Sequence, residues 1–119
     1  MVTHIVSCIL CAIKIIHNLY SPIAGHSLST VICYESIFPD LVRQFVSHGA
    51  ELLVVITNDG WFGVSSAPWQ HLRMGVVRAV ENRRYEVRTA NTGISAIIDP
   101  YGRVEGATPI GAGAWRTAG

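Results

Sequence analysis

The sequence predicts an α/β fold built around a strand–helix–strand unit. Residues 28–32 and 52–57 are short apolar runs of strand character, and apolar residues recur at helical spacing between them. Two strands joined through a helix pair in parallel, with a right-handed crossover. The 119 residues, 50% hydrophobic and 14% charged, suit one globular domain and argue against disorder.

Net charge and cysteine content exclude several classes of function. A net charge of +1 provides no electrostatic basis for binding nucleic acid. The three cysteines, Cys8, Cys11 and Cys33, form no regular disulfide framework. Cys8 and Cys11 make a C-x-x-C pair, but no second Cys or His pair lies at zinc spacing, so we predict neither a metal site nor a cofactor.

Residues 1–24 are not assigned to the domain. Their apolar stretch, residues 2–16, is interrupted by His4 and Lys14 and is shorter than the roughly 20 apolar residues that span a bilayer. It also lacks the basic start of a signal peptide. The segment is either a membrane-surface or packing helix or a start foreign to the native domain, and we favour the second interpretation.

The first helix is predicted to begin at Pro39, because proline suits a first helical turn. Gly49 is a typical residue for ending it. The continuous apolar run of residues 52–57 then predicts a strand buried on both faces. The apolar face of the helix consists of Leu41, Val42, Phe45 and Val46.

A second helix is predicted after Ser65 and Ser66, which are candidate caps before Pro68. Arg78 and Glu81 lie three residues apart on this helix, where they can pair. Its predicted core-facing stripe consists of Trp69, Leu72, Val76, Val77 and Val80.

The remainder of the domain predicts a hairpin and a turn. Residues 86–90 and 94–98 have strand character, and Asn-Thr-Gly at residues 91–93 is a hairpin-type turn. Residues 99–102, Asp-Pro-Tyr-Gly, have the composition of a type I turn. We therefore take residues 25–105 as the domain and residues 106–119 as a loop or frayed tail.

Cys33 lies where the first predicted strand turns toward the helix, and Glu35 follows two residues later. A nucleophile on a sharp strand-to-helix turn is exposed and lies near backbone N–H groups that can hold an oxyanion. A thiol there also needs a base and a positive neighbour to become a thiolate. The alternative is a buried core cysteine, since free cysteine is among the most buried residue types.

A second candidate feature is the loop of residues 58–63, Asn-Asp-Gly-Trp-Phe-Gly, which directly follows the second strand. Functional sites of α/β sheets gather at the carboxyl ends of strands. Trp61 and Phe62 form either an apolar wall beside Cys33 or a pair of aromatic side chains buried in the core.

Several short motifs follow one another in a characteristic order. The set resembles the C-terminal half of the nitrilase-like carbon–nitrogen hydrolase domain of the apolipoprotein N-acyltransferase family, over about residues 28–104. Carbon–nitrogen hydrolases in general share Cys-x-Glu, whereas its combination with Asn-Asp-x-Trp-Phe-Gly is specific. The motifs are Ile32-Cys-Tyr-Glu35, Phe38-Pro39, Gly49-Ala50, Thr57-Asn-Asp-Gly-Trp-Phe-Gly63, Gln70-His71, Arg78-Ala79-x-Glu81, Arg88-x-x-Asn91 and Ile98-Asp-Pro-x-Gly102.

The resemblance implies a partial α-β-β-α sandwich and a cysteine acyl-transfer site without a cofactor. In that family the cysteine takes an acyl chain from a phospholipid as a thioester and passes it to the N-terminal cysteine amine of an apolipoprotein. By correspondence of motifs, Cys33 is the nucleophile, the Tyr34 N–H is a candidate oxyanion donor and Glu35 is a supporting carboxylate. The corresponding substrate-binding residues are Asn58, Trp61 and Phe62.

The chain also departs from the family pattern. The family's base glutamate and its lysine lie upstream of the cysteine, whereas here Lys14 is the only lysine and no glutamate precedes Glu35. The family's membrane helices have no counterpart. We therefore expect a catalytically incomplete piece of an enzyme of the bacterial inner membrane, with its site facing the periplasm. An uncovered sheet face and exposed strand edges predict self-association.

Two other interpretations stay open. The chain is alternatively a soluble carbon–nitrogen hydrolase that cleaves small amides or nitriles with the same cysteine, or an inactive product of a truncated gene. His71 suggests a Cys–His dyad, but the resemblance assigns it no such role and its position does not show that it faces Cys33.

Overall fold

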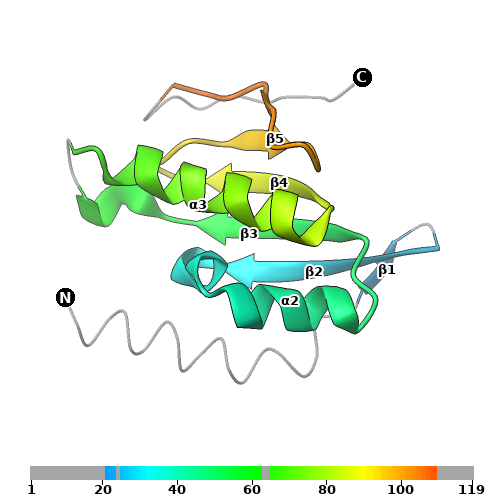
Figure 1. The fold of residues 1–119 in the computed structure, drawn as a ribbon. Coiled ribbons are helices and arrows are strands. Elements are labelled where there is room, and N and C mark those ends of the chain that lie inside the picture. Colours follow the sequence, from blue (N-terminus) through cyan, green and yellow to red (C-terminus); the bar gives the residue numbers. More distant parts are fainter. Residues whose placement is uncertain (1–20, 24, 63–64, 110–119) are drawn as a thin grey trace.

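The computed structural model describes residues 21–23, 25–62 and 65–109, so Cys8, Cys11 and Lys14 lie outside it. The described residues form one mixed sheet with two α-helices and two 3-10 helices (Figure 1). The strands, in their order across the sheet, are β1 (Ser21–Ile23), β2 (His26–Ile32), β3 (Leu52–Thr57), β4 (Tyr85–Ala90), β5 (Ala96–Ile98) and β6 (Val104–Glu105). The helices are η1 (Cys33–Ile37), α2 (Pro39–Ser47), η2 (Asp59–Phe62) and α3 (Ala67–Asn82).

The central strands β2, β3 and β4 are parallel, and a helix makes each crossover between them. α2 connects β2 to β3, and α3 connects β3 to β4. β1, β5 and β6 extend the sheet as antiparallel strands. The predicted α/β class and the strand–helix–strand unit are therefore confirmed.

Helix α2 begins and ends where the sequence predicts. Pro39 is its first residue, and Phe45 and Val46 pack against the buried core. Gly49 follows the helix with a φ of +102°, a left-handed conformation that glycine adopts without steric cost. Its N–H donates to Val46 O at 2.9 Å, and the N–H of Ala50 donates to Phe45 O at 3.1 Å, which are the paired bonds of a Schellman cap.

Two apolar clusters fill the space between the helices and the sheet. Both helices lie on the same face of the sheet (Figure 1), and the register places Leu53, Glu86 and Ile98 side by side on that face. One cluster, under α2, consists of Val31, Val42, Leu53 and Val55. The other, under α3, consists of Leu72, Ala79, Ile94, Ala96 and Ile98.

The predicted core-facing stripe of α3 is wrong in three positions. Trp69, Val77 and Val80 are 51%, 44% and 46% exposed, whereas Leu72 is buried and Val76 partly buried. Hydrophobicity alone does not identify the packed face of α3, because several of the residues on it are polar or small. The polar ones form hydrogen bonds with residues of other elements. The packed face consists of Pro68, His71, Leu72, Gly75, Arg78 and Ala79.

The prediction that β3 is buried on both faces is also wrong. Leu53, Val55 and Thr57 lie under the helices and are buried, whereas Ile56 is 47% exposed. Within the described part of the chain, no helix covers the other face. The register places Leu52, Val54, Ile56, Tyr85 and Val87 together there, and we call these five residues the open sheet face.

β4 and β5 form the predicted hairpin, although β5 begins at Ala96, two residues later than expected. The predicted Asp99 turn is confirmed by a hydrogen bond from Gly102 N–H to Asp99 O at 2.9 Å. Beyond it, the N–H of buried Thr108 donates to Ser95 O at 2.9 Å, and Ser95 N–H donates to Thr108 Oγ1 at 3.1 Å. The first residues of the predicted tail therefore contact the hairpin.

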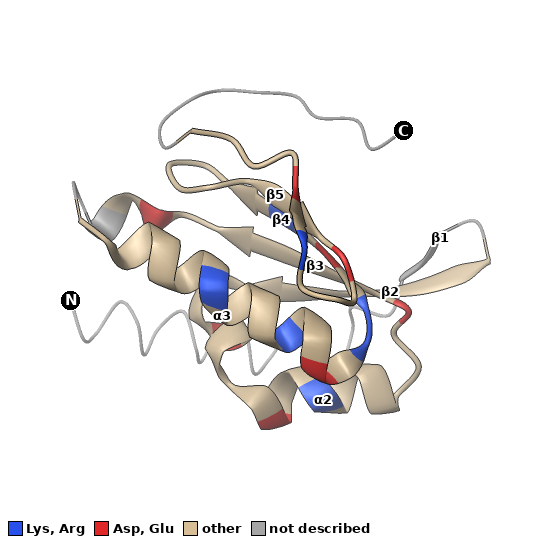
Figure 2. Ribbon diagram, turned by 45° about the horizontal axis from the view of Figure 1, so that its top comes forward, with Lys and Arg blue, Asp and Glu red and all other residues tan. Residues whose placement is uncertain are grey.

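Charged side chains of α3 and β4 are buried, and Figure 2 colours the charged residues along the ribbon. Arg78 on α3 pairs with Glu81 as predicted, with Nε and Oε2 3.0 Å apart. Glu86 and Arg88 lie on the helix-facing side of β4 and are almost fully buried. The Glu86 carboxylate has no hydrogen-bond partner among the described residues and lies against α3, where a Cβ on Gly75 would be 2.3 Å from Glu86 Oε1. Burial raises the pKa of Glu86 to about 7, against the opposing charges of Arg88 and Arg78.

Leu72→Ala is expected to lower the free energy of unfolding by about 2–5 kcal/mol, because it empties a buried site under α3. Val77→Ala, on the outer face of the same helix, is expected to change it by less than about 0.5 kcal/mol. Urea denaturation followed by circular dichroism measures both values. Equal losses for the two variants would contradict the observed orientation of α3.

Glu86 is expected to make the protein less stable as pH rises. Its pKa is raised from 4.5 to about 7, so between these values the folded state binds a proton that the unfolded state releases. This contribution is fully present below about pH 4.5, is lost by about pH 7, and amounts to about 3 kcal/mol. Urea titrations across this range are expected to show a steeper decline in the wild type and in the exposed control Glu105→Gln than in Glu86→Gln. A wild-type minus Glu86→Gln difference that does not change with pH would sink this prediction.

Candidate functional site

Cys33 lies at the junction of β2 and η1, on the sharp strand-to-helix turn that the sequence predicts. It is the first residue of η1, is partly exposed and has a free thiol. Its φ of +52° lies in the left-handed region, where a residue other than glycine costs about 1–3 kcal/mol. Contacts from the surrounding structure must therefore hold Cys33 in this conformation.

The strand register brings the two candidate loops together. Ile32 pairs with Ile56 across the parallel strands β2 and β3, so Cys33 and Thr57 leave the sheet at the same edge. η1 directly follows β2, and η2 follows β3 after one residue. The carboxyl edge of these two strands therefore carries residues of both loops, which is where sites of α/β sheets are found.

Glu35 holds the end of β2. It is 4% exposed, and its Oε2 accepts a hydrogen bond from the N–H of Ile32 at 2.7 Å. Burial raises the pKa of Glu35, and the hydrogen bond from Ile32 opposes that shift. The carboxyl group thus contacts the main chain of the residue that precedes Cys33.

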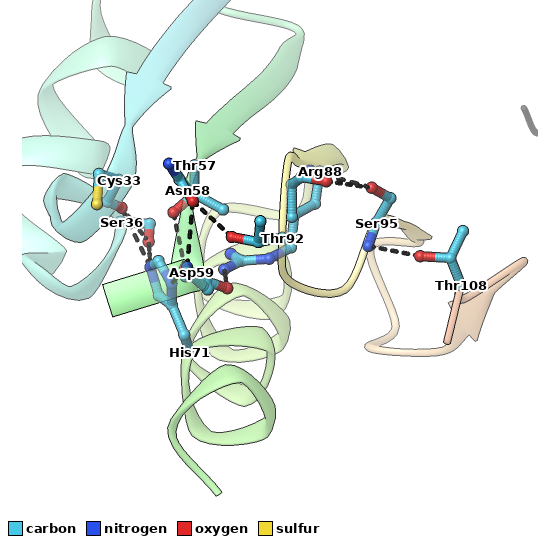
Figure 3. A network of polar contacts seen from close by, with 12 residues as sticks. Cys33, Ser36, Thr57, Asn58, Asp59, His71, Arg88, Thr92, Ser95 and Thr108 are labelled. Atoms are coloured by element: carbon cyan, nitrogen blue, oxygen red, sulfur yellow. Dashed lines mark hydrogen bonds and ion pairs between the residues drawn. The ribbon is translucent and has the colours of Figure 1, made fainter. Parts of the chain in front are cut away.

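His71 on α3 lies beside the Cys33 turn, as Figure 3 shows. Its Nε2 is 3.1 Å from the carbonyl oxygen of Cys33 and 3.1 Å from Ser36 Oγ. Ser36 Oγ itself donates to the Cys33 carbonyl at 3.1 Å. The ring of Tyr34 stacks on the imidazole with the centroids 5.1 Å apart. α3 therefore contacts the main chain of the predicted nucleophile through a buried histidine.

Asp59 joins this histidine to two further elements. Its Oδ1 lies 2.9 Å from His71 Nδ1 and accepts a hydrogen bond from Thr57 Oγ1 at 2.9 Å, while its Oδ2 lies 3.5 Å from Arg88 Nη2. Burial opposes ionisation of Asp59. The hydrogen bonds from His71 and Thr57 and the charges of His71 and Arg88 outweigh burial, so the pKa of Asp59 lies below its ordinary value.

Arg88 places a positive charge next to the Asp59 carboxylate. Its side chain is fully buried. Burial lowers the pKa of Arg88, whereas the charges of Asp59 and Glu86 and the hydrogen bond to Asp59 raise it. A positive neighbour is one of the two groups that a nucleophilic cysteine needs.

The turn between β4 and β5 closes over Asp59. A Cβ on Gly93 would lie 2.3 Å from Asp59 Oδ2, so only glycine permits this approach. Asn58 Oδ1 accepts hydrogen bonds from the N–H of Gly60 at 3.1 Å and from the hydroxyl of Thr92. The predicted substrate-binding residue Asn58 therefore ties its own loop to the neighbouring turn.

The structure brings Cys33, Tyr34 and Glu35 together in η1, with Asn58 in the adjacent loop. Trp61 and Phe62 belong to η2. Their side chains are not among those that the structure describes, so their place beside Cys33 stays a prediction. The catalytic and binding roles of all six residues are likewise predictions, which the geometry permits.

The motifs contain Asp59, His71 and Arg88, but motif spacing assigned no role to Asp59 or Arg88 and suggested His71 only as a dyad partner of Cys33. Asp59 lies inside an Asn-Asp-Gly turn signal, and His71 is a single histidine near the start of a helix. The available signal is weak: His71 and Arg78 are seven residues apart and so share one helical face with Leu72, which indicates a buried polar stripe on α3.

Comparisons with known proteins agree with this geometry. A family model described as carbon–nitrogen hydrolase matches residues 13–112. The apolipoprotein N-acyltransferases of Geobacter metallireducens and Thermotoga maritima are 57% and 52% identical to the chain over 83 residues. Each match covers 70% of this chain, which in turn spans only 16% of the length of either relative.

Solved structures show the same fold. An amidase from Nesterenkonia sp. AN1, with the acetamide moiety of fluoroacetamide added covalently at its active site cysteine, is 28% identical with a TM-score of 0.57. That match covers 72% of this chain and 35% of the amidase. Saccharomyces cerevisiae Nit3, a member of branch 10 of the nitrilase superfamily, is 22% identical with a TM-score of 0.62, covering 71% of this chain and 34% of Nit3.

These findings confirm a partial nitrilase-like fold and the resemblance to apolipoprotein N-acyltransferases. The family model extends over most of the sequence, and the arrangement of strands and helices agrees with it. The chain belongs to the carbon–nitrogen hydrolase family.

Proposed function

We propose that this chain carries the nucleophile of an acyltransferase that moves an acyl chain from a phospholipid to the N-terminal cysteine amine of an apolipoprotein. The observation that carries the proposal is the left-handed Cys33 at the end of a parallel strand, with its carbonyl held by His71 and Ser36. The relatives named apolipoprotein N-acyltransferase, 57% and 52% identical, support this reaction.

The proposed reaction has two acyl transfers. Cys33 Sγ attacks the ester carbonyl of the phospholipid, a thioester C–S bond forms, the ester C–O bond breaks, and the lysophospholipid leaves as an alcohol that has taken up the thiol proton. The acceptor amine then attacks the thioester, an amide C–N bond forms, the C–S bond breaks, and the proton that the amine loses returns to the departing Cys33 thiolate. Each tetrahedral intermediate carries an oxyanion, for which the backbone N–H of Tyr34 is the proposed donor. Glu35 supports the site by holding the N–H of Ile32.

The loop after β3 is the proposed border of the acyl site. Its start lies beside Cys33 because β2 and β3 are in register, and Asn58 ties the loop to Thr92. Trp61 and Phe62 would supply an apolar surface, which suits the hydrocarbon chain of a phospholipid.

The chain by itself is proposed to be catalytically incomplete. The resemblance implies a base glutamate and a lysine before the cysteine, but among these 119 residues no glutamate precedes Glu35 and Lys14 is the only lysine. Arg88 offers a positive charge and no base. Because removing one partner of a catalytic triad commonly costs several orders of magnitude in rate, we expect very slow turnover or none.

The proposed setting is the bacterial inner membrane, with the site facing the periplasm and with phospholipid and apolipoprotein as partners. The relatives, which are apolipoprotein N-acyltransferases, support an apolipoprotein acceptor. In the part of the chain that the structure describes, every helix is too short or too polar to cross a membrane.

A second candidate function is hydrolysis of a small amide by the same cysteine. The amidase of Nesterenkonia sp. AN1, 28% identical to the chain, shows covalent addition at its active site cysteine. Both candidate reactions use a covalent intermediate on the cysteine, and they differ in the acceptor of the acyl group, which is an amine in one and water in the other.

A hybrid enzyme tests the proposed transfer. Residues 25–105 of this chain replace the matching segment of the Geobacter metallireducens relative, which supplies the rest of that enzyme. We expect the hybrid to move an acyl chain from phospholipid to a lipopeptide amine, and Cys33→Ser to lower the rate by at least about 10³-fold. Before the lipopeptide is added, intact mass is expected to show a hydroxylamine-labile acyl adduct that Cys33→Ser lacks.

The matched control is the isolated 119-residue chain, on which we expect no adduct or only a trace. Robust turnover by that chain would contradict the proposed incompleteness. A hybrid that hydrolyses small amides and transfers nothing to the lipopeptide would favour the second candidate function.

The isolated chain is expected to self-associate through the open sheet face, because apolar side chains remain exposed there. Ile56→Lys places a charge on that face, at the carboxyl end of β3, and is expected to shift the sedimentation profile toward monomer. Val77→Lys is the matched control, since Val77 is 44% exposed on α3 and Ile56 is 47% exposed. A wild-type chain that sediments as a single monomeric species would rule this out.

A further inference from the structure

We propose that His71 is a positioning residue, a buried imidazolium that fixes the main chain of Cys33 through its carbonyl oxygen and transfers no proton. This rests on the proposed function only in taking Cys33 as the nucleophile. It follows from counting the hydrogen-bond donors and acceptors around the two ring nitrogens of His71.

The first ring nitrogen must carry a proton. Nδ1 of His71 is 2.9 Å from Oδ1 of Asp59, and both side chains are buried. Asp59 is ionised at neutral pH, since its pKa lies below the ordinary value despite burial. An ionised carboxylate only accepts hydrogen bonds, so Nδ1 of His71 is a donor.

The second ring nitrogen is placed to donate as well. Nε2 is 3.1 Å from the Cys33 carbonyl oxygen and 3.1 Å from Ser36 Oγ. A carbonyl oxygen only accepts, and the geometry lets the Ser36 hydroxyl donate to this carbonyl at 3.1 Å while its oxygen accepts from Nε2–H. An unprotonated Nε2 would accept from Ser36 but would also direct its lone pair toward the carbonyl oxygen, whereas Nε2–H satisfies both neighbours.

The surroundings compensate the charge of this imidazolium. Asp59 supplies a negative charge in direct contact, and the ring of Tyr34 is stacked on the imidazole. Arg88 also approaches Asp59, but its distance of 3.5 Å exceeds the 2.9 Å of the His71 contact. His71 is therefore the closer of the two side chains that donate to this buried carboxylate, and Arg88 is the second.

The contact to the carbonyl accounts for the backbone conformation of Cys33. With φ at +52°, this residue would relax to a more populated region if its carbonyl were released. The hydrogen-bond contacts of His71 run to the Cys33 carbonyl, to Ser36 and to Asp59, and none runs to the sulfur (Figure 3). His71 thus orients the nucleophile, and a Cys–His dyad is not formed.

Magic-angle-spinning NMR of the full chain labelled with ¹⁵N-histidine reads the proton count directly, and this method tolerates self-association. At neutral pH we expect both ring nitrogens of His71 to show protonated-type resonances, assigned by their loss in His71→Gln. In Asp59→Asn, which keeps the shape and removes the charge, we expect one of them to shift to the unprotonated position. An unprotonated ring nitrogen of His71 in the wild type would overturn the proposal.

In a chain labelled with ¹³C only at the cysteine carbonyls, the resonance of Cys33, assigned by its loss in Cys33→Ser, reports the contact itself. We expect this resonance to shift in His71→Leu, which removes the donor, and to stay near its wild-type position in His71→Gln, whose amide can still donate. No shift in a folded His71→Leu chain would refute the positioning role. If that variant does not fold, the ¹⁵N resonances of the His71 ring in the wild type and in Asp59→Asn provide the test. Neither readout involves acyl transfer, so failure of the hybrid enzyme would overturn the proposed function and leave this inference standing.

Discussion

The contacts of the buried Asp59 carboxylate are the interaction on which the candidate site depends. Thr57, His71 and Arg88 surround this one group, and they come from β3, α3 and β4. A buried carboxylate without partners would be unfavourable by several kcal/mol, so it persists only where donors are supplied. Because the donors belong to different elements, Asp59 determines how α3 and β4 meet the carboxyl edge of β3. The absence of a side chain at Gly93 allows the hairpin turn to close over it.

The same constraint explains the orientation of α3. The helix turns His71 and Arg78 inward and leaves Trp69 and Val77 in contact with solvent. Burying these polar groups is tolerable because each has partners, with Arg78 donating to Ile37 O as well as to Glu81. Glu86 differs from them: among the described residues only the charges of nearby arginines compensate its burial, which is why its pKa is raised.

The two faces of the sheet consequently have different roles. One is covered by both helices and carries the polar cluster at its carboxyl edge, so Cys33 is held by contacts from η1 and α3. The other is the open sheet face, with Ile56 and Tyr85 about half exposed. The solved relatives are longer proteins, of which this chain matches 35% and 34%, so their folds contain elements beyond the matched part.

The amino-acid sequence by itself determined the order of β2 to β5 and of the two α-helices, and the position of Cys33 between β2 and α2, whereas it did not predict β1 or β6. These features follow from local signals: Pro39 begins α2, Gly49 ends it, and apolar runs mark β2 and β3. The motif around Cys33 was equally readable, because the strand, the cysteine and the helix are contiguous in the chain.

Only the tertiary structure decided which face of α3 is buried and what surrounds the nucleophile. His71 reaches Asp59 across 12 residues of sequence and the Cys33 carbonyl across 38. Such contacts depend on the register of β2 against β3 and on the rotation of α3 about its axis. Hydrophobic patterning does not determine that rotation when the buried side chains are polar, because their stabilisation comes from partners that are distant in sequence.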